Sequence, residues 1–113
     1  MHAENRMMEG RELIQLAVGV YQLILAFDGS VTLSVESSVR FEIGALGGEW
    51  FPENPHSAAN LTALVGKKVV RVEEGSEDEL HMTFAEAGTL SVSGKSPYGE
   101  AYQLTWPGGM HVV

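Results

Sequence analysis

Residues 27–35 read FDGSVTLSV, and residues 84–92 read FAEAGTLSV, so Phe-x-x-x-x-Thr-Leu-Ser-Val occurs twice with the same internal spacing. Upstream of each copy, residues 10–16 (GRELIQL) correspond to residues 66–72 (GKKVVRV), and the two correspondences differ in offset by one residue. Two matches in the same order and almost in register indicate two tandem copies of one unit.

Each copy alternates apolar and polar residues with a period of two. In the first copy, Val31, Leu33 and Val35 alternate with Thr32 and Ser34, which is typical of a half-buried antiparallel strand. The dipeptide Asp28-Gly29 between two such runs predicts a two-residue hairpin, because a type I′ turn needs positive φ.

Helical patterns are shorter, and we expect them at residues 57–65 and 3–9, before the strands of each copy. Residues 44–55 are rich in Gly, Pro and aromatic residues and are interpreted as a connector. A unit of roughly 55 residues makes a marginal core alone, so the two apolar faces must pack together. The predicted fold is mainly β, with α+β as the alternative: two antiparallel β-meander repeats, each preceded by a short helix, packed about a pseudo-two-fold axis as a sandwich or flattened barrel. Residues 1–113 then form one domain, with repeats at about 1–55 and 56–113.

Three apolar residues break the alternation. Leu13, Val69 and Ile24 have the opposite parity to the main apolar set and are predicted to point outward. Cover by the short helices is the favoured interpretation, and a homodimer is the alternative.

Composition and charge narrow the class of protein. The chain has 113 residues, 44% of them hydrophobic, and no cysteine, so disulfides, thiolate zinc sites and cysteine nucleophiles are excluded. The N-terminal residues are polar, and the longest apolar run, residues 23–27, is too short for a membrane helix, so we expect a soluble cytoplasmic protein. Fifteen Asp and Glu against seven Lys and Arg give a net charge of −8, which disfavours nucleic acid and anionic membranes. This charge suits a basic protein partner and also promotes solubility.

The candidate site residues fall into two groups. The acidic run in the first hairpin of the second copy has no calcium-loop pattern, so it is either a solvated turn or a contact for a basic partner. Its residues are Glu73, Glu74, Glu77, Asp78 and Glu79. The second group would line a ligand pocket at one end of the sandwich, although Trp50 and Phe51 could instead plug the core. Its residues are Trp50, Phe51, His81, Tyr102 and Trp106.

The sequence contains no recognisable motif for a catalytic nucleophile or a metal site. No serine lies in a Gly-x-Ser-x-Gly elbow, and no two histidines have the spacing of a local metal pair, so we expect no metal and no cofactor. His81 is placed on the outer face of its strand, without a carboxylate held firmly beside it. We therefore expect a non-catalytic protein-interaction or accessory module with an acidic surface, whose partner is a basic protein or a second copy. The alternative is a small-ligand-binding β domain with an aromatic-lined pocket, and a catalytic cluster of distant residues is left open.

The chain resembles a family of small bacterial proteins known only as a domain of unknown function. The resemblance rests on a start of the type Val-Gly-(Arg/Lys), a hairpin ending Phe27-Asp28-Gly29, and the tail at residues 98–108 (YGEAYQLTWPG), and it runs from about Gly10 to the C-terminus. In the tail, Tyr102 stands where the family pattern has Trp, and Gly99 is an additional residue. The resemblance implies a fold and no catalytic residues, and some members are associated with immunity-type proteins of bacterial toxin systems.

Overall fold

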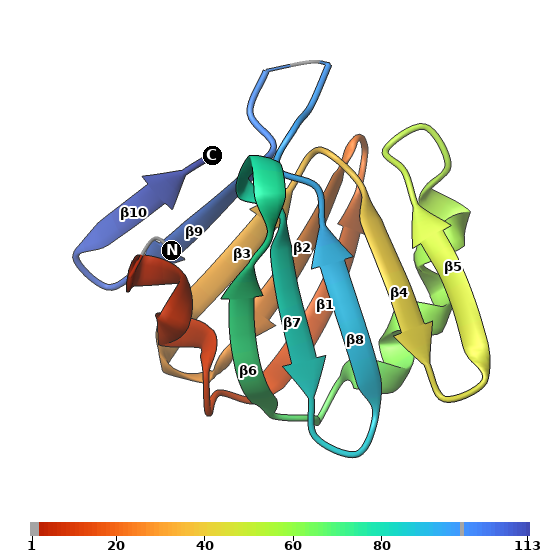
Figure 1. The fold of residues 1–113 in the computed structure, drawn as a ribbon, viewed down its shortest axis with the longest axis horizontal. Helices are drawn as coiled ribbons and strands as arrows, with labels where there is room; N and C mark the ends of the chain where they lie inside the picture. Colours follow the sequence, from red (N-terminus) through yellow and green to blue (C-terminus); the bar gives the residue numbers. More distant parts are fainter. Residues whose placement is uncertain (1–2, 98) are drawn as a thin grey trace.

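In the computed structural model, which describes residues 3–97 and 99–113, ten strands form two antiparallel sheets that face each other as a sandwich (Figure 1). Sheet 1 contains, in spatial order, β1 (Leu13–Gly19), β2 (Gln22–Phe27), β3 (Val31–Val35), β9 (Tyr102–Trp106) and β10 (Gly109–Val112). Sheet 2 contains, in spatial order, β5 (Leu46–Trp50), β4 (Val39–Ile43), β8 (Gly88–Val92), β7 (Leu80–Phe84) and β6 (Val69–Glu74). The mainly β prediction is confirmed, and the strands form two separate sheets rather than one closed sheet.

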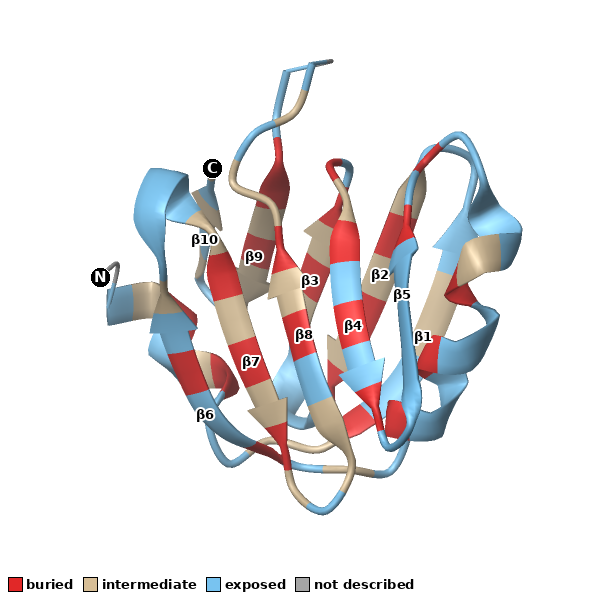
Figure 2. Cartoon of the chain, turned by 45° about the vertical axis from the view of Figure 1, so that its right-hand side comes forward, coloured by how far each residue is buried: buried red, intermediate tan, exposed pale blue. Residues whose placement is uncertain are grey.

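Short 3₁₀ segments accompany the strands. They are η1 (Ala3–Met8), η2 (Asp28–Ser30), η3 (Pro55–Leu64) and η4 (Ser76–Asp78). The helices predicted at residues 3–9 and 57–65 correspond to η1 and η3, with 3₁₀ geometry. Because η3 packs against the edge strands β1 and β5, and η1 packs against the edge strand β6, these segments lie beside the open sides of the sandwich (Figure 2).

Each sheet takes strands from both halves of the chain. The hairpin β4–β5 follows β3 in the sequence but pairs with β8 of sheet 2, and the hairpin β9–β10 follows β8 but pairs with β3 of sheet 1. The prediction that each repeat forms its own complete meander is wrong. Instead, only the first three strands of each half stay together, and the terminal hairpin crosses over and extends the other sheet.

The interpretation of residues 44–55 as a connector is wrong, because they contain β5. Gly47 and Gly48 interrupt the alternation that would have marked a strand, yet both pair with β4. A Cβ at Gly48 would lie 2.7 Å from the ring of Phe41 on the neighbouring strand, so glycine here leaves room for that ring. The C-terminal strand β10 was missed for the same reason, since a Cβ at Gly109 would lie 2.7 Å from the ring of Trp106.

The two-residue hairpin predicted at Asp28-Gly29 is also wrong. Phe27 pairs with Val31, so the connection holds three residues, and both Gly29 and Ser30 have positive φ. The carboxylate of Asp28 accepts a hydrogen bond from the backbone N–H of Glu12 at 3.0 Å, which fastens this turn to the chain entering β1.

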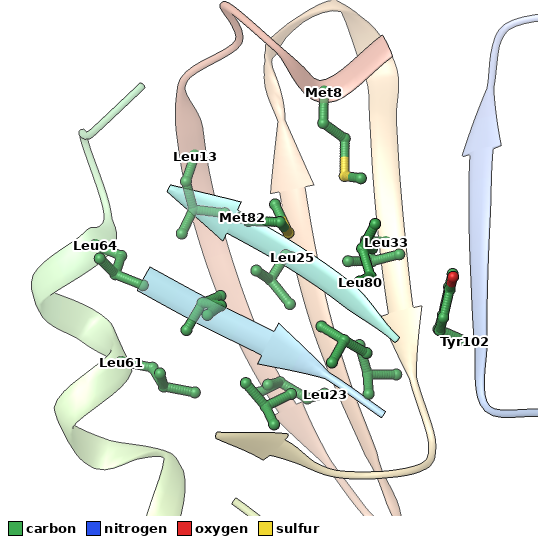
Figure 3. Close-up of a cluster of buried hydrophobic side chains, with 14 of the residues drawn as sticks. Met8, Leu13, Leu23, Leu25, Leu33, Leu61, Leu64, Leu80, Met82 and Tyr102 are labelled. Carbon is green, nitrogen blue, oxygen red and sulfur yellow. The ribbon is translucent and has the colours of Figure 1, made fainter. Parts of the chain in front are cut away.

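The core lies between the sheets and is built from the alternating residues that the sequence marks (Figure 3). The core includes Leu23, Leu25 and Phe27 of β2 and Leu80, Met82 and Phe84 of β7, and all six are at most 2% exposed. Leu61 and Leu64 of η3 and Met8 of η1 complete the core at its sides.

The prediction that Leu13 and Val69 point outward is wrong, since both side chains are completely buried. The register of β1 against β2 shifts between Leu13 and Gln15, and that of β6 against β7 shifts between Val69 and Arg71. Each shift is a one-residue bulge, which reverses the inward and outward faces on one side of it. Ile24 keeps its outward parity and is partly buried.

Candidate functional site

Five connections lie at one end of the sandwich, which we call the acidic end. They are the β1–β2 turn (20–21), the β3–β4 crossover (36–38), the β5–η3 loop (51–54), the β6–β7 turn (75–79) and the β8–β9 loop (93–101). Backbone hydrogen bonds from Ser93 to Ser38 and from Glu36 to Ala101 join two of these segments. Among the described residues, the five connections carry six carboxylates and one lysine, whereas the connections at the opposite end carry four carboxylates and three cations.

The acidic run begins at the end of β6 and continues through the β6–β7 turn of this region. Glu73 and Glu74 end β6, Glu77 and Asp78 belong to η4, and Glu79 precedes β7. Its carboxylates already have intramolecular neighbours, because Lys95 Nζ lies 3.0 Å from Glu77 and Arg40 lies 3.5 Å from Glu79. The side-chain amide of the buried Asn5 donates to Glu74 at 2.8 Å. The run is therefore held in a defined conformation, and Glu36, Glu53 and Glu100 add charge from the other connections.

His81 connects the acidic end to the outer face of sheet 2. Its Nε2 lies 2.9 Å from a carboxylate oxygen of Glu79, and its Nδ1 lies 2.8 Å from the hydroxyl oxygen of Ser91. Sequence reasoning missed this arrangement because Glu79 was assigned to an unsupported loop. The signal that could have revealed it is the pairing of β7 with β8, which places His81 directly opposite Ser91.

The series Ser91, His81 and Glu79 contains the residue types of a nucleophile, a base and an orienting acid. Catalysis of acyl transfer also needs donors aimed at the developing oxyanion. Ser91 lies in β8 between β7 and β4, where strand pairing engages the backbone on both sides, and the surrounding face is an open sheet. The backbone of β8 beside Ser91 is therefore engaged in strand pairing.

The five pocket candidates do not gather around one cavity. Trp50 is completely buried and Tyr102 is 1% exposed, so both belong to the core, whereas Phe51 is 43% exposed at the acidic end. Trp106 packs against the edge of the core beside Gly109, and His81 lies on the outer face of sheet 2. The rings of Trp50 and Tyr102 are therefore packed within the core.

A cavity does exist at the acidic end, with other residues around it. It has a volume of about 530 Å³ and is lined by Val20 and Tyr21 of the β1–β2 turn, Glu36 of the crossover, and Pro52 and Glu53 of the β5–η3 loop. This volume is within the range of small-ligand pockets. Sequence reasoning missed these residues because they come from three connections far apart in the chain.

Tyr102 links the core to the β6–β7 turn. Its hydroxyl group donates to the backbone carbonyl of Asp78 at 3.0 Å. Burial, together with the carboxylates of Glu74 and Asp78, raises the pKa of Tyr102 to about 12, although the side chain of Asn5 acts in the opposite direction. The buried phenol therefore stays neutral in the folded protein at a pH where it would ionise in the unfolded chain.

This difference predicts a loss of stability between pH 10 and pH 12. The unfolded tyrosine has a pKa of about 10, so the folded protein holds the proton more tightly. The contribution is complete below pH 10, falls as the pH rises towards 12, and amounts to about 2–3 kcal/mol. Urea unfolding at pH 9 and pH 11.5 measures it, and Tyr102→Phe serves as the control because it removes the titrating group. An equal loss in both proteins would show that Tyr102 is not its source.

The outer faces of the two sheets differ in charge. On sheet 1, two complete cross-strand rows hold no charged side chain: Gln15, Ala26, Thr32, Thr105 and Met110 in one, and Ala17, Ile24, Ser34, Gln103 and Val112 in the other. On sheet 2, the corresponding rows hold Glu73, His81, Ser91, Arg40 and Glu49 in one, and Arg71, Thr83, Thr89, Glu42 and Gly47 in the other. Charge depletion is typical of the buried centre of a protein interface.

Two further findings concern the described residues 3–97 and 99–113. Within them, no helix has the length and apolar character needed to cross a membrane, and no group of three or more His, Asp or Glu could hold a metal ion. Tyr98 of the tail motif and His2 lie outside the described residues.

A comparison with models of protein families shows which family the chain belongs to. The model of a family of unknown function, DUF6188, matches residues 5–113, which is nearly the whole chain, so the protein belongs to this family. Neither the curated proteins nor the solved structures that were compared with the chain give a match.

Proposed function

We propose that this family member is a non-catalytic interaction module, an accessory protein of the bacterial cytoplasm that binds a basic protein through its acidic end. The observation that carries the proposal is the concentration of six carboxylates, with one lysine, among the described residues of the connections at that end. Such a surface attracts a cationic partner over several ångströms and orients it before contact. An immunity-type protein that covers a basic toxin surface would have this property.

The state of the acidic run supports binding rather than general solubility. A solvated run needs no fixed conformation, but the β6–β7 turn is fastened to the core by Tyr102 and to the β8–β9 loop by the Lys95–Glu77 ion pair. A Cβ at Gly94 would collide with the backbone of Glu77 and Asp78, so that loop approaches the turn closely. A held array of charges loses less conformational entropy when it binds a partner.

The binding prediction uses a pair of matched double variants. An octa-arginine peptide should bind the wild-type protein, and Glu77→Gln with Glu100→Gln should weaken binding at least about tenfold at low salt. The control is Glu42→Gln with Glu86→Gln, which changes the net charge equally away from the acidic end and should alter the dissociation constant less than about twofold. Both pairs contain one carboxylate residue at positive φ, Glu77 or Glu86, so their backbone contexts match.

Isothermal titration calorimetry at two salt concentrations provides the measurement. Affinity should fall as salt rises, since the contact is electrostatic. If both double variants weaken binding equally, the affinity for the peptide depends only on the net charge of the protein. The acidic end is then not the binding site. Absence of binding to any basic peptide at low salt would contradict the proposed function itself.

Two other proposals are supported by separate observations. Self-association would use the outer face of sheet 1, because its central rows are uncharged on a chain of net charge −8. Sedimentation over a range of protein concentrations tests it, and a monomer throughout would contradict it. Small-ligand binding would use the 530 Å³ cavity rather than the aromatic residues of the core.

We also propose that the chain arose by internal duplication and packs about a pseudo-two-fold axis. Three strands of one half plus a hairpin of the other build each sheet, in equivalent orders. The bulges lie at corresponding positions of β1 and β6. Hydrogen bonds between the halves are reciprocal, since Gly10 N–H donates to Val69 and Gly66 N–H donates to Leu13, both at 2.7 Å. These observations support the proposal, and superposition of the two halves in an experimental structure tests it.

A further inference from the structure

The cavity at the acidic end has one apolar side and one charged side. Val20, Tyr21 and Pro52 supply the apolar surface, and Glu36 and Glu53 supply carboxylates from two different connections. We infer that this cavity binds an arginine side chain of the basic partner. The inference rests on the proposed function and adds the residue type and the place at which the partner is anchored.

The apolar side is unusual for a hairpin tip. Val20 is 81% exposed and Tyr21 is 66% exposed, although tips normally carry Gly, Asn or Asp. Tyr21 also has a φ of 62°, a conformation that is unfavourable for an aromatic residue. The β6–β7 turn at the same end consists of polar and charged residues, so an apolar tip is not required to close such a hairpin. Exposed apolar residues beside a cavity are instead typical of a binding site.

The charged side restricts the class of ligand. Glu36 is exposed, and no cation of the described residues forms an ion pair with it. An anionic ligand would be repelled by the six carboxylates of the acidic end, and a purely apolar ligand would desolvate Glu36 without compensation. The ligand therefore combines a positive charge with an apolar body.

Arginine fits both sides better than lysine does. Its planar guanidinium stacks on an aromatic ring and can donate two hydrogen bonds to one carboxylate, whereas the lysine ammonium is compact and strongly hydrated. The methylene stem would lie against Val20 and Pro52 while the guanidinium contacts Tyr21 and Glu36. This is also how arginine serves as an anchor residue in many protein interfaces.

The experiment is an NMR titration of the ¹⁵N-labelled full chain with acetyl-Gly-Gly-Arg-Gly-Gly-amide. The control peptide carries citrulline in place of arginine, which keeps the shape and removes the charge. The arginine peptide should shift the amide resonances of Val20, Tyr21, Glu36 and Glu53, and the citrulline peptide should bind at least about fivefold more weakly. Equal binding of the two peptides, or shifts confined to residues 75–79, would overturn the inference.

Two variants separate binding from folding. Glu36→Gln should weaken binding of the arginine peptide at least about threefold. Glu42→Gln, on the exposed face of β4, should leave the affinity for this peptide unchanged. Tyr21→Asn removes the ring but places a residue that accepts positive φ, so it should lose binding without losing thermal stability. A Tyr21→Asn protein that is stable and binds with unchanged affinity would contradict the inference.

Failure of the inference can be told from failure of the proposed function. If octa-arginine binds and depends on Glu77 and Glu100 but not on Glu36 or Tyr21, the acidic end binds basic partners without this anchor. If the single-arginine peptide occupies the cavity while octa-arginine does not bind, the cavity is a site for small cations and the proposed interaction function is wrong.

Discussion

Replacement of Phe27 or Phe84 with alanine should lower the free energy of unfolding by about 3–5 kcal/mol in each case. Both rings lie between the sheets and are at most 2% exposed. Their removal loses the burial of a large apolar surface and leaves a cavity that the two facing sheets cannot close. Since a domain of this size has a total stability of about 5–15 kcal/mol, either change removes a large part of it.

Urea unfolding followed by circular dichroism measures this loss. The control is Phe51→Ala, the same substitution at a ring that is 43% exposed, which should cost less than about 1 kcal/mol. If Phe27→Ala cost no more than this control, the inner and outer faces of β2 would have been assigned in reverse.

The second large effect concerns two adjacent residues at the bulge of β1. Leu13→Ala should cost about 2–5 kcal/mol, because the side chain is completely buried. Ile14→Ala should change stability by less than about 0.5 kcal/mol, since Ile14 is the bulged residue and is 52% exposed. A simple alternation without the bulge predicts the reverse order, so the same unfolding measurement on this pair reports the register directly.

The strands with regular alternation could be predicted from the sequence, because burial on one face imposes the period of two. This covers β2, β3, β7 and β8, whose inward residues are the expected ones. The strands β5 and β10 could not be predicted, since their glycines accommodate a ring from the neighbouring strand, and that ring is known only after the strands are paired. The bulges at Ile14 and Val70 also depend on pairing, which is why Leu13 and Val69 were misplaced.

The candidate site was predictable only where it is contiguous. The acidic run from Glu73 to Glu79 is visible as a charge cluster, but Glu36 and Glu53 reach the same end through connections that the sequence alone does not bring together. The link from Glu79 through His81 to Ser91 likewise depends on the register of β7 and β8. In contrast, Trp50 and Tyr102 are aromatic residues of the type that often lines a ligand pocket, yet their side chains are buried between the sheets.

The crossing hairpins make the two halves of the chain mechanically interdependent. A cut between residues 55 and 56 would leave each fragment with three strands of one sheet and a hairpin that belongs to the other, so neither fragment could assemble a complete sheet. If one half of the chain unfolds, the sheet built mainly by the other half loses two of its five strands. The two sheets are therefore expected to lose their structure together.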